Sequence, residues 1–249
     1  MHFINEIFKF MYPNNFHFFN ETVQIMLKEL QKIYFGHTFL EGELIIPDNC
    51  KGLVIFSHGS GSGRFSPRNN FVAQYLNKLS LGTFLFDLLT KEEALDYTIR
   101  FDIPILTARL IKVTKYLLKF TMIKRLPICF FGGSTGATSA MIASISLPNK
   151  IAAIVSRGGR LDLTYEQLPL VDAPSLLIVG EFDEDILEIN RKAIDLLQVP
   201  KKLEIVSGAS HLFEEAGTLE QVAELAGEWF LRYTGQQSDL KNQMSKNTD

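Results

Sequence analysis

The 249-residue sequence has little of what several protein classes require. Its two cysteines, Cys50 and Cys129, are too few for a disulfide framework, and no cysteine–histidine cluster has the spacing of a metal site. The net charge is −3, whereas nucleic-acid binding needs a basic surface. These scarcities argue against a disulfide scaffold, a metal protein and a general nucleic-acid binder. Such cysteine usage predicts a cytoplasmic protein.

Nucleotide-binding motifs are also missing. The glycine-rich segment 59–63 does not complete a dinucleotide fingerprint, because Arg64 in one register and Ser66 in the other stand where the third glycine belongs. No Gly-Lys-Ser/Thr follows it, so a P-loop is excluded as well. Segment 59–63 is therefore not expected to be a phosphate-binding loop.

What the sequence does contain is an alternation of strand and helix patterns, with no internal repeat. Apolar runs predict strands over 44–47, 52–57, 83–88, 127–132, 152–156, 174–180 and 202–207. Helical patterns fill the gaps over 71–81, 103–120, 135–146, 185–197 and 218–233. This order predicts an α/β fold with a mostly parallel central sheet and helices on both faces. Little room for a cap remains between 156 and 174, so we expect an open, shallow pocket.

The expected organisation is an amino-terminal extension over 1–39, one α/β domain over 40–234 and a disordered tail over 235–249. Residues 1–19 place phenylalanines on one helical face, which is typical either of a membrane-surface or docking helix or of a helix packed on the domain. Charged residues within it rule out a membrane span, and no secretory signal pattern is present.

The most informative segment is 128–138, where a strand pattern enters Gly-Gly-Ser-Thr-Gly and then a helix pattern. This order predicts a nucleophile elbow with Ser134 at the sharp turn. Gly132 and Gly136 would remove side chains that collide there. The helix that follows would point its free N–H groups at the site.

A nucleophilic serine needs a base and an acid, and both follow in the order Ser, Asp, His. His211 comes after the last predicted strand and is the expected base. Asp183 follows the strand before it and is the favoured acid, with Asp162 as the rival. The neighbours of Asp183, such as Glu181, are expected at a solvated helix start.

An oxyanion hole is expected between the early glycine-rich loop and the elbow. The backbone amides of Ser60 and Thr135 are the two candidate donors. His58, at the start of the loop, is expected to hold the loop in place and not to act as a base.

Four arginines sit on loops at predicted strand ends: Arg64, Arg68, Arg157 and Arg160. Arg64, Arg157 and Arg160 are candidates for binding a carboxylate or phosphate of the substrate. The alternative is that loop arginines pair with nearby acids and hold the loops together. Asp87, Asp102 and Asp162 are the acids available for that role.

These motifs resemble α/β-hydrolases of the dienelactone-hydrolase-like group, closest to a small bacterial branch often found fused to phosphoribosyltransferase domains. The resemblance rests on residues 58–64 with 66–69, 133–137, 156–160 and 208–215, and it covers roughly 40–234. It implies an α/β-hydrolase fold and a catalytic triad. Dienelactone hydrolase itself uses a cysteine nucleophile where this chain has Ser134, so that enzyme's substrate is not carried over.

The function predicted is a serine hydrolase that cleaves a small ester, thioester or lactone through an acyl-enzyme, with no metal or organic cofactor. The expected partner is a small-molecule substrate, with neither nucleic acid nor a membrane span. Amidase and acyltransferase chemistry share the triad and stay open. A non-catalytic binding module on the same fold is the alternative from another class.

Overall fold

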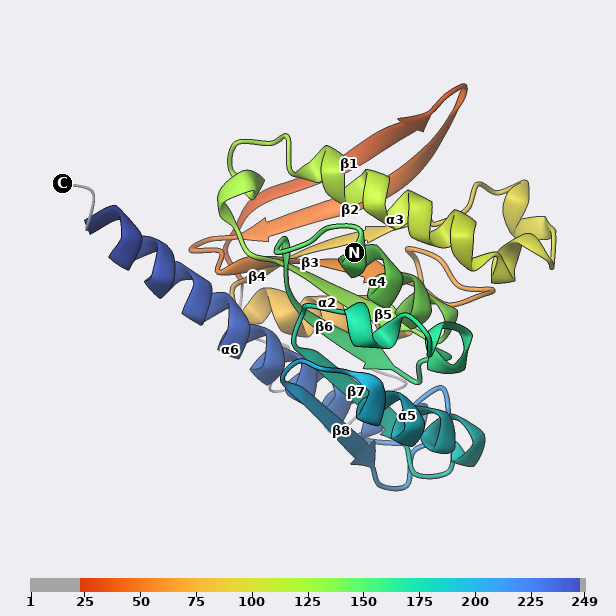
Figure 1. Cartoon of the computed structure of the whole chain (residues 1–249). Helices are drawn as coiled ribbons and strands as arrows, with labels where there is room; N and C mark the ends of the chain where they lie inside the picture. The colour runs from red at the N-terminus through yellow and green to blue at the C-terminus, as the bar shows by residue number, and fades with distance from the viewer. Residues whose placement is uncertain (1–22, 247–249) are drawn as a thin grey trace.

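The computed structural model describes residues 23–246, which form one eight-stranded sheet with helices on both faces (Figure 1). The strand order is β1-β2-β4-β3-β5-β6-β7-β8. The strands are β1 Ile25–Phe35, β2 Thr38–Pro47, β3 Gly52–Ser57, β4 Leu81–Phe86, β5 Ile128–Gly133, β6 Ile151–Arg157, β7 Ser175–Gly180 and β8 Lys201–Val206. The helices are α2 Pro67–Lys78, α3 Ile103–Leu117, α4 Thr135–Ile145, α5 Glu184–Leu196 and α6 Thr218–Lys246.

Strands β3 to β8 pair in parallel, and the predicted α/β-hydrolase architecture is confirmed. Parallel pairing requires a crossover between consecutive strands, and each crossover contains an α-helix except the one from β6 to β7, which has two short 3₁₀ helices. The central strands are buried along their whole length, which explains their unbroken apolar sequences. Both faces of the sheet must therefore be covered.

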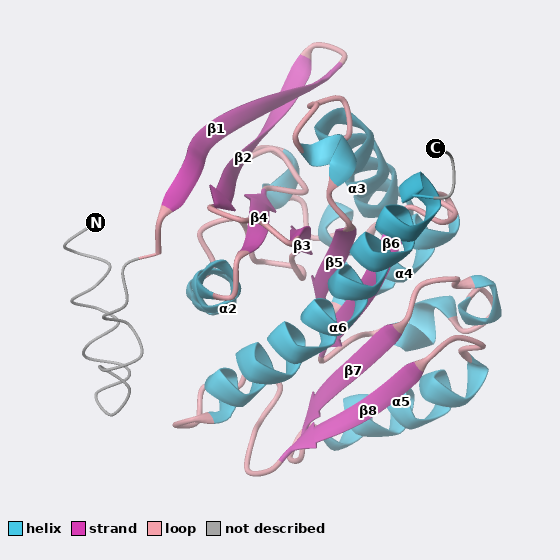
Figure 2. Ribbon diagram, turned by 90° about the vertical axis from the view of Figure 1, so that its left-hand side faces the viewer, coloured by secondary structure: helices cyan, strands magenta, loops and turns pink. Residues whose placement is uncertain are grey.

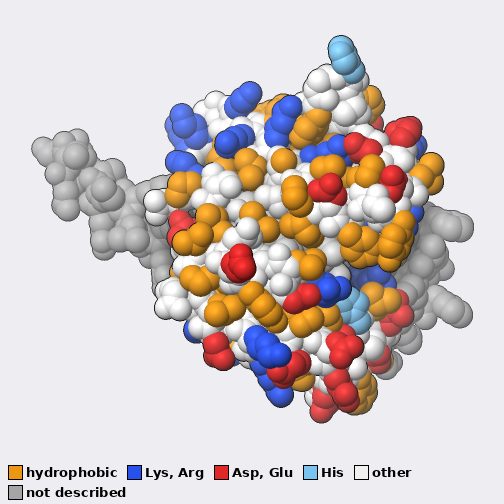
Figure 3. Space-filling model, turned by 45° about the vertical axis from the view of Figure 1, so that its right-hand side comes forward, with side chains coloured by type: hydrophobic (Ala, Val, Ile, Leu, Met, Phe, Trp, Pro, Cys, Tyr) orange, Lys and Arg blue, Asp and Glu red, His pale blue; other side chains and the backbone are white. Residues whose placement is uncertain are grey.

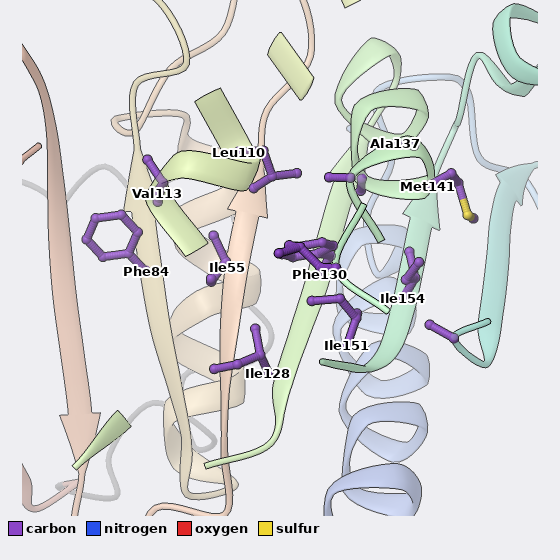
Figure 4. Packing of buried hydrophobic residues seen from close by; sticks show 14 of the residues in the cluster. Ile55, Phe84, Leu110, Val113, Ile128, Phe130, Ala137, Met141, Ile151 and Ile154 are labelled. Atoms are coloured by element: carbon purple, nitrogen blue, oxygen red, sulfur yellow. The ribbon is translucent and has the colours of Figure 1, made fainter. Parts of the chain in front are cut away.

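Two hydrophobic cores cover the two faces. One lies between the sheet and helices α3, α4 and α5, and the other between the sheet and helices α2 and α6 (Figure 2). In the first core, Phe130 of β5 lies between Ile55 of β3 and Ile154 of β6 (Figure 4). Ala137 and Met141 of α4 close this core beside it. This packing fixes where β5 ends and α4 begins.

The first two strands form an antiparallel hairpin that extends the sheet past β4 (Figure 2). The predicted boundary between residues 39 and 40 falls inside β2, and the sequence analysis assigned no strand to β1. Only Gln31 and Ile33 of β1 are buried, so the strand has almost no alternation of apolar and polar residues that could indicate it.

The two ends of the chain were expected to lie outside the domain, as an extension and a disordered tail. Helix α6 continues to Lys246, so residues 235–246, which the sequence analysis placed in a disordered tail, are helical. The phenylalanine-rich segment 1–19 lies outside the described residues. No helix in the described range 23–246 combines the length and apolar character that crossing a bilayer demands.

Because parallel strands end at one edge of a sheet, the loops that follow β3, β5, β6, β7 and β8 gather there. These loops carry every residue that the sequence analysis proposed for catalysis. Acidic, basic and hydrophobic side chains are interspersed on the face turned toward the viewer in Figure 3.

Candidate active site

Ser134 occupies a strained turn between β5 and α4. Its backbone has φ 51° and ψ −120°, a conformation that side-chain-bearing residues rarely adopt. Along residues 127–141, Ser134 is partly exposed and every other residue is buried. The fold therefore presents one hydroxyl from an otherwise buried segment, as a nucleophile elbow requires.

The glycines on each side of Ser134 make this turn sterically possible. A Cβ added to Gly132 would lie 2.4 Å from the Cα of Ala137. One added to Gly136 would lie 2.0 Å from the carbonyl oxygen of Ser57. Both contacts are with backbone that cannot move away, so the predicted reason for these two glycines is confirmed.

His211 and Asp183 are in direct contact. The Nδ1 atom of His211 lies 2.5 Å from Oδ2 of Asp183. Asp183 precedes the first residue of α5, but its side chain makes no capping hydrogen bond to that helix, and its carboxylate bonds the histidine ring instead. A carboxylate at Nδ1 holds the ring in the tautomer whose Nε2 carries a lone pair and can accept a proton.

The rival acid, Asp162, is held elsewhere. Its two carboxylate oxygens accept hydrogen bonds from Nε and Nη2 of Arg160, at 2.9 and 2.8 Å. The Arg160 guanidinium holds the pKa of the Asp162 carboxyl below its usual range. Of the two candidate acids, Asp183 is the one that contacts His211.

Residues 157–160, which follow β6, connect the serine to the histidine. The Ser134 amide donates to the carbonyl of Arg157 (3.1 Å), and the Arg160 amide donates to the carbonyl of Ser134 (3.2 Å). Between them, Gly158 has φ +56°, and a Cβ there would lie 3.2 Å from Cε1 of His211. This loop therefore packs on the backbone of Ser134 and on the ring of His211. The Ser134 hydroxyl itself makes no hydrogen bond in the described chain, and such bonds often tighten only when substrate binds.

Two glutamates that the sequence analysis did not assign to the site hold the His211 loop. Glu181 accepts hydrogen bonds from the Ser207 hydroxyl and the Gly208 amide, both at 2.7 Å, so it is not part of the helix start expected for it. Glu215 accepts the Ser210 amide at 3.1 Å. These bonds lower the pKa of both carboxyls. The only available signal was the nearness of these glutamates to Asp183 and His211 in the sequence.

The two amides proposed for the oxyanion hole lie close together. Thr135 is the first residue of α4, where helix geometry leaves its N–H without an intrahelical acceptor. The Ser60 amide donates to the Thr135 side-chain oxygen at 3.0 Å. In this conformation the Ser60 N–H is therefore engaged, and it must be shared or released before it can bind an oxyanion.

His58 anchors the oxyanion loop, as predicted. Its Nδ1 atom lies 2.9 Å from the Gly59 carbonyl oxygen, and its Nε2 accepts the Leu88 amide at 2.9 Å. Both ring nitrogens are thus occupied by backbone groups, which requires the neutral ring. Burial lowers the pKa of His58, which favours that neutral form.

The arginines proposed for substrate binding divide into two groups. Arg64 is paired with Glu41 (2.7 Å) and Asp87 (2.9 Å), and Arg160 is paired with Asp162. For these two the structure favours the loop-holding alternative. Arg157 makes no ion pair within residues 23–246, and its Nε and Nη1 atoms are buried without an acceptor. Asp102, another acid considered as a partner, accepts the Ile105 amide at the start of α3.

A cavity of about 850 Å³ opens beside the oxyanion loop. Phe39 of the hairpin, Leu89 after β4 and Leu106 of α3 supply apolar walls, and Gly59 and Ser60 belong to its lining. A Cβ on Gly59 would lie 3.0 Å from the Ser134 Cβ, so this loop packs against Ser134, which does not itself line the cavity. The hairpin and the segment after β4 supply walls of this cavity that the sequence did not indicate.

The cysteines are separate from this chemistry. Cys129 is buried in β5, and burial raises the pKa of its thiol. The described residues contain no group of three or more His, Cys, Asp or Glu side chains arranged to hold a metal ion.

The comparisons with known proteins agree with this fold. A dienelactone hydrolase from Anabaena variabilis, solved by crystallography, is 44% identical, and the match covers 84% of this chain and 99% of that one with a TM-score of 0.81. The chain belongs to the dienelactone hydrolase family of α/β-hydrolases. No protein-family model matches it.

Two mycobacterial proteins and one Butyrivibrio protein are also similar to this chain. Two proteins of Mycobacterium tuberculosis, from strains CDC 1551 and H37Rv, are provisionally named phosphoribosyl transferases and are 46% identical over 196 residues. That stretch is 79% of this chain and 44% of each relative, so the chain spans less than half of their length. Est1E from Butyrivibrio proteoclasticus shares the fold at 18% identity and a TM-score of 0.71, over 83% of this chain and 99% of that one.

Proposed function

We propose that this dienelactone hydrolase family member is a serine hydrolase that cleaves small esters, thioesters or lactones. The observation that carries the proposal is the 2.5 Å contact between His211 Nδ1 and Asp183 Oδ2, beside a strained elbow with a partly exposed serine. Nucleophile, base and orienting acid occur in the chain order typical of α/β-hydrolases.

In the proposed mechanism, Ser134 Oγ attacks the substrate carbonyl while its proton passes to Nε2 of His211. Asp183 accepts the Nδ1–H bond and stabilises the imidazolium that forms. The carbonyl oxygen becomes an oxyanion, which the Thr135 amide binds together with the Ser60 amide once the latter turns from the Thr135 hydroxyl. His211 then gives the proton to the leaving group, and the acyl-enzyme remains.

Deacylation repeats the sequence with water. His211 takes a proton from water, the hydroxide adds to the acyl carbonyl, and Ser134 leaves with its proton returned. No metal or organic cofactor takes part in these steps. An amine or alcohol acceptor in place of water would give acyl transfer through the same residues.

We infer that the phosphoribosyl transferase name of the mycobacterial relatives refers to the part of those proteins outside the match. The support is that this chain aligns with 99% of the Anabaena hydrolase, so the shared stretch has the extent of a hydrolase. A cytoplasmic location stays a proposal, with both cysteines present as free thiols.

A fluorophosphonate probe tests the proposed function. We expect the probe to label the wild-type protein and the Ser146→Ala control, which changes an exposed serine at the far end of α4. Ser134→Ala should take no label and should not hydrolyse short p-nitrophenyl esters. A folded wild-type protein that neither reacts with the probe nor hydrolyses any ester would contradict the proposal and favour the non-catalytic binding module.

A further inference from the structure

Asn190 is a polar side chain at a position where helix α5 faces the core. It is entirely buried, as are Ile186 and Ala193 one turn to either side of it in the same helix. Asparagine is a poor residue for a helix interior, because its amide competes with the backbone for hydrogen bonds. Burial also strips water from both ends of that amide, which costs free energy. An apolar residue would therefore suit this position better, unless the amide itself has a task.

The amide nitrogen of Asn190 makes two hydrogen bonds that lead in different directions. Nδ2 donates to the Ile186 carbonyl within α5 at 2.8 Å and to the Gly159 carbonyl outside it at 2.9 Å. Because two carbonyl oxygens surround this end of the amide, it has to be the donating NH₂ end. The Oδ1 atom is buried, and no donor for it lies within residues 23–246. The fold thus keeps the bond to Gly159 although an unsatisfied oxygen comes with it.

Gly159 belongs to the loop after β6, which contacts two residues of the proposed triad. That loop exchanges two backbone hydrogen bonds with Ser134, and its Gly158 packs on the ring of His211. Gly159 is buried, and in the described chain its carbonyl has the Asn190 side chain as its donor. A buried carbonyl needs a partner, so Asn190 fixes the loop on the side that faces α5.

Helix α5 begins directly after Asp183, the proposed acid. The Asp183 carbonyl accepts the Leu187 amide at 2.8 Å, so the acid is held by the first turn of α5. The His211 ring contacts both elements. Its Nδ1 atom lies 2.5 Å from Oδ2 of Asp183, and its Cε1 atom lies 3.2 Å from where a Cβ of Gly158 would be. The placement of α5 against the loop after β6 therefore sets the geometry of the bond between acid and base.

We propose that Asn190 is a positioning residue of the proposed triad. Its side chain ties the helix that carries Asp183 to the loop that packs on Ser134 and His211. This inference rests on the proposed hydrolase function and adds to it a residue that does not touch the substrate. Without the bond to Gly159, the loop and the helix can shift against each other. A displacement of about 1 Å from a change far from the chemistry is enough to lower a rate by roughly 10²-fold.

Two substitutions of Asn190 separate its two hydrogen bonds. Asn190→Leu keeps the approximate size of the side chain and removes both bonds. Asn190→Thr keeps a hydroxyl that can bond to the Ile186 carbonyl four residues earlier in the helix, but this side chain is too short to reach Gly159. The bond to Gly159 is the one that carries the proposal, so we expect both variants to have the same catalytic defect.

The matched control is Tyr165→Phe. The Tyr165 hydroxyl donates to the Ile189 carbonyl at 3.0 Å, so this substitution also removes one hydrogen bond between α5 and the segment after β6. Tyr165 lies beyond the loop that packs on Ser134 and His211. Loss of this bond should therefore leave the triad in place.

Steady-state kinetics on a short p-nitrophenyl ester distinguishes positioning from substrate binding. Both Asn190 variants should lower kcat by about 10- to 100-fold with KM little changed, because proton transfer is disturbed and binding is not. Tyr165→Phe should retain the wild-type kcat. Full activity of Asn190→Leu, or an equal loss in Tyr165→Phe, would overturn the positioning role and leave the hydrolase intact.

Proton NMR reads the contact between acid and base without any substrate. A proton held in a short bond between an imidazole and a carboxylate resonates at very low field, and Asp183→Asn identifies this signal by abolishing it. We expect the signal in the wild type and in Tyr165→Phe. In both Asn190 variants it should move upfield or broaden. An unchanged signal in those variants, or none in the wild type, would overturn the positioning role.

The NMR result also separates the two proposals. If the wild type hydrolyses no ester, the proposed function fails, whereas the effect of Asn190 on the low-field signal can still be measured. Circular dichroism and thermal unfolding check each variant. We expect both Asn190 variants to fold with a modest loss of melting temperature, because the Gly159 carbonyl loses its donor. Failure of both to fold would mean that Asn190 serves the fold and would overturn the proposal.

Discussion

The two sides of Ser134 differ in how their charged and polar groups are satisfied. On the side of the oxyanion loop, Arg64 has two carboxylate partners and both nitrogens of His58 bond to backbone. On the other side, the half-buried Arg157 packs against Phe213, and two of its nitrogens have no acceptor among the described residues. On the first side every one of these groups has a partner, whereas on the other side two buried nitrogens have no acceptor among the described residues.

This difference shows how structural and functional charges can be separated. A charged group whose partner is supplied by the fold contributes to the shape of the loop, as Asp162 does by holding Arg160. The carboxylate of Asp183 instead contacts His211, the other residue proposed for proton transfer. Asp162 and Asp183 are both aspartates that follow a strand, so only the partner of each carboxylate separates their roles.

The largest expected effect separates Asp183 from Asp162. Asp183→Asn should lower kcat by roughly 10⁴-fold, because the amide no longer holds His211 in the proton-accepting tautomer. Asp162→Asn should cost far less, because it weakens only the hold on Arg160. Ester hydrolysis by the two purified variants, each checked for folding by circular dichroism, measures this. A greater loss for Asp162→Asn would reverse the assignment of the acid.

The next effect concerns Thr135, whose side chain holds the Ser60 amide. Thr135→Val keeps the shape but removes the acceptor, so the oxyanion loop loses its fixed position. We expect kcat to fall by about tenfold, less than the 10²- to 10³-fold typical of deleting a donor, with KM little changed. A faster variant would mean that the Thr135 hydroxyl competes with the oxyanion for this amide.

Stability tests the comparison between the two arginines directly. Arg64→Met removes the cation that Asp87 contacts and leaves Glu41 only its longer ion pair with Lys32, so we expect a lower melting temperature than in the wild type. Arg157→Met has no carboxylate to abandon, so its melting temperature should not fall. Thermal unfolding of both variants, followed by calorimetry, gives the two signs. Equal destabilisation would remove the distinction between the two sides.

The smallest effect is on pH dependence and concerns His58. Its pKa is lowered in the folded state by burial, so the unfolded chain binds more protons as the pH falls through the ordinary histidine range. The stabilisation gained by keeping His58 neutral is present above the pKa that this histidine has in the unfolded chain. It is lost as the pH falls below that pKa. His58→Asn should therefore have a shallower fall in melting temperature below about pH 6.5 than the wild type. Parallel curves for the two proteins would contradict this.

Much of the fold could be predicted because its signals are local. Buried parallel strands require continuous apolar runs, so β3, β5 and β7 stand out in the sequence. Strand β1 could not be predicted, since it buries little beyond Gln31 and Ile33 and relies on pairing with β2. Tertiary pairing of that kind leaves no local pattern.

Part of the candidate site could also be predicted from the sequence, and part could not. Ser134 and its glycines form a compact motif with a steric reason behind each residue, so the elbow was predictable from the sequence. The state of the arginines was not, because Arg64 finds Glu41 on a strand that precedes it, and Arg157 finds no carboxylate among the described residues. Which charges meet depends on strand order, which the sequence order of the loops does not reveal.

The most direct test of the account is to trap the acyl-enzyme. A short p-nitrophenyl ester is mixed rapidly with the protein, the reaction is quenched in acid, and the peptides are analysed by mass spectrometry. We predict a burst of p-nitrophenol and an acyl group on the peptide that contains Ser134, both absent in Ser134→Ala. Turnover without a burst, with no adduct or with the adduct on another residue, would contradict a nucleophilic Ser134 supported by His211 and Asp183.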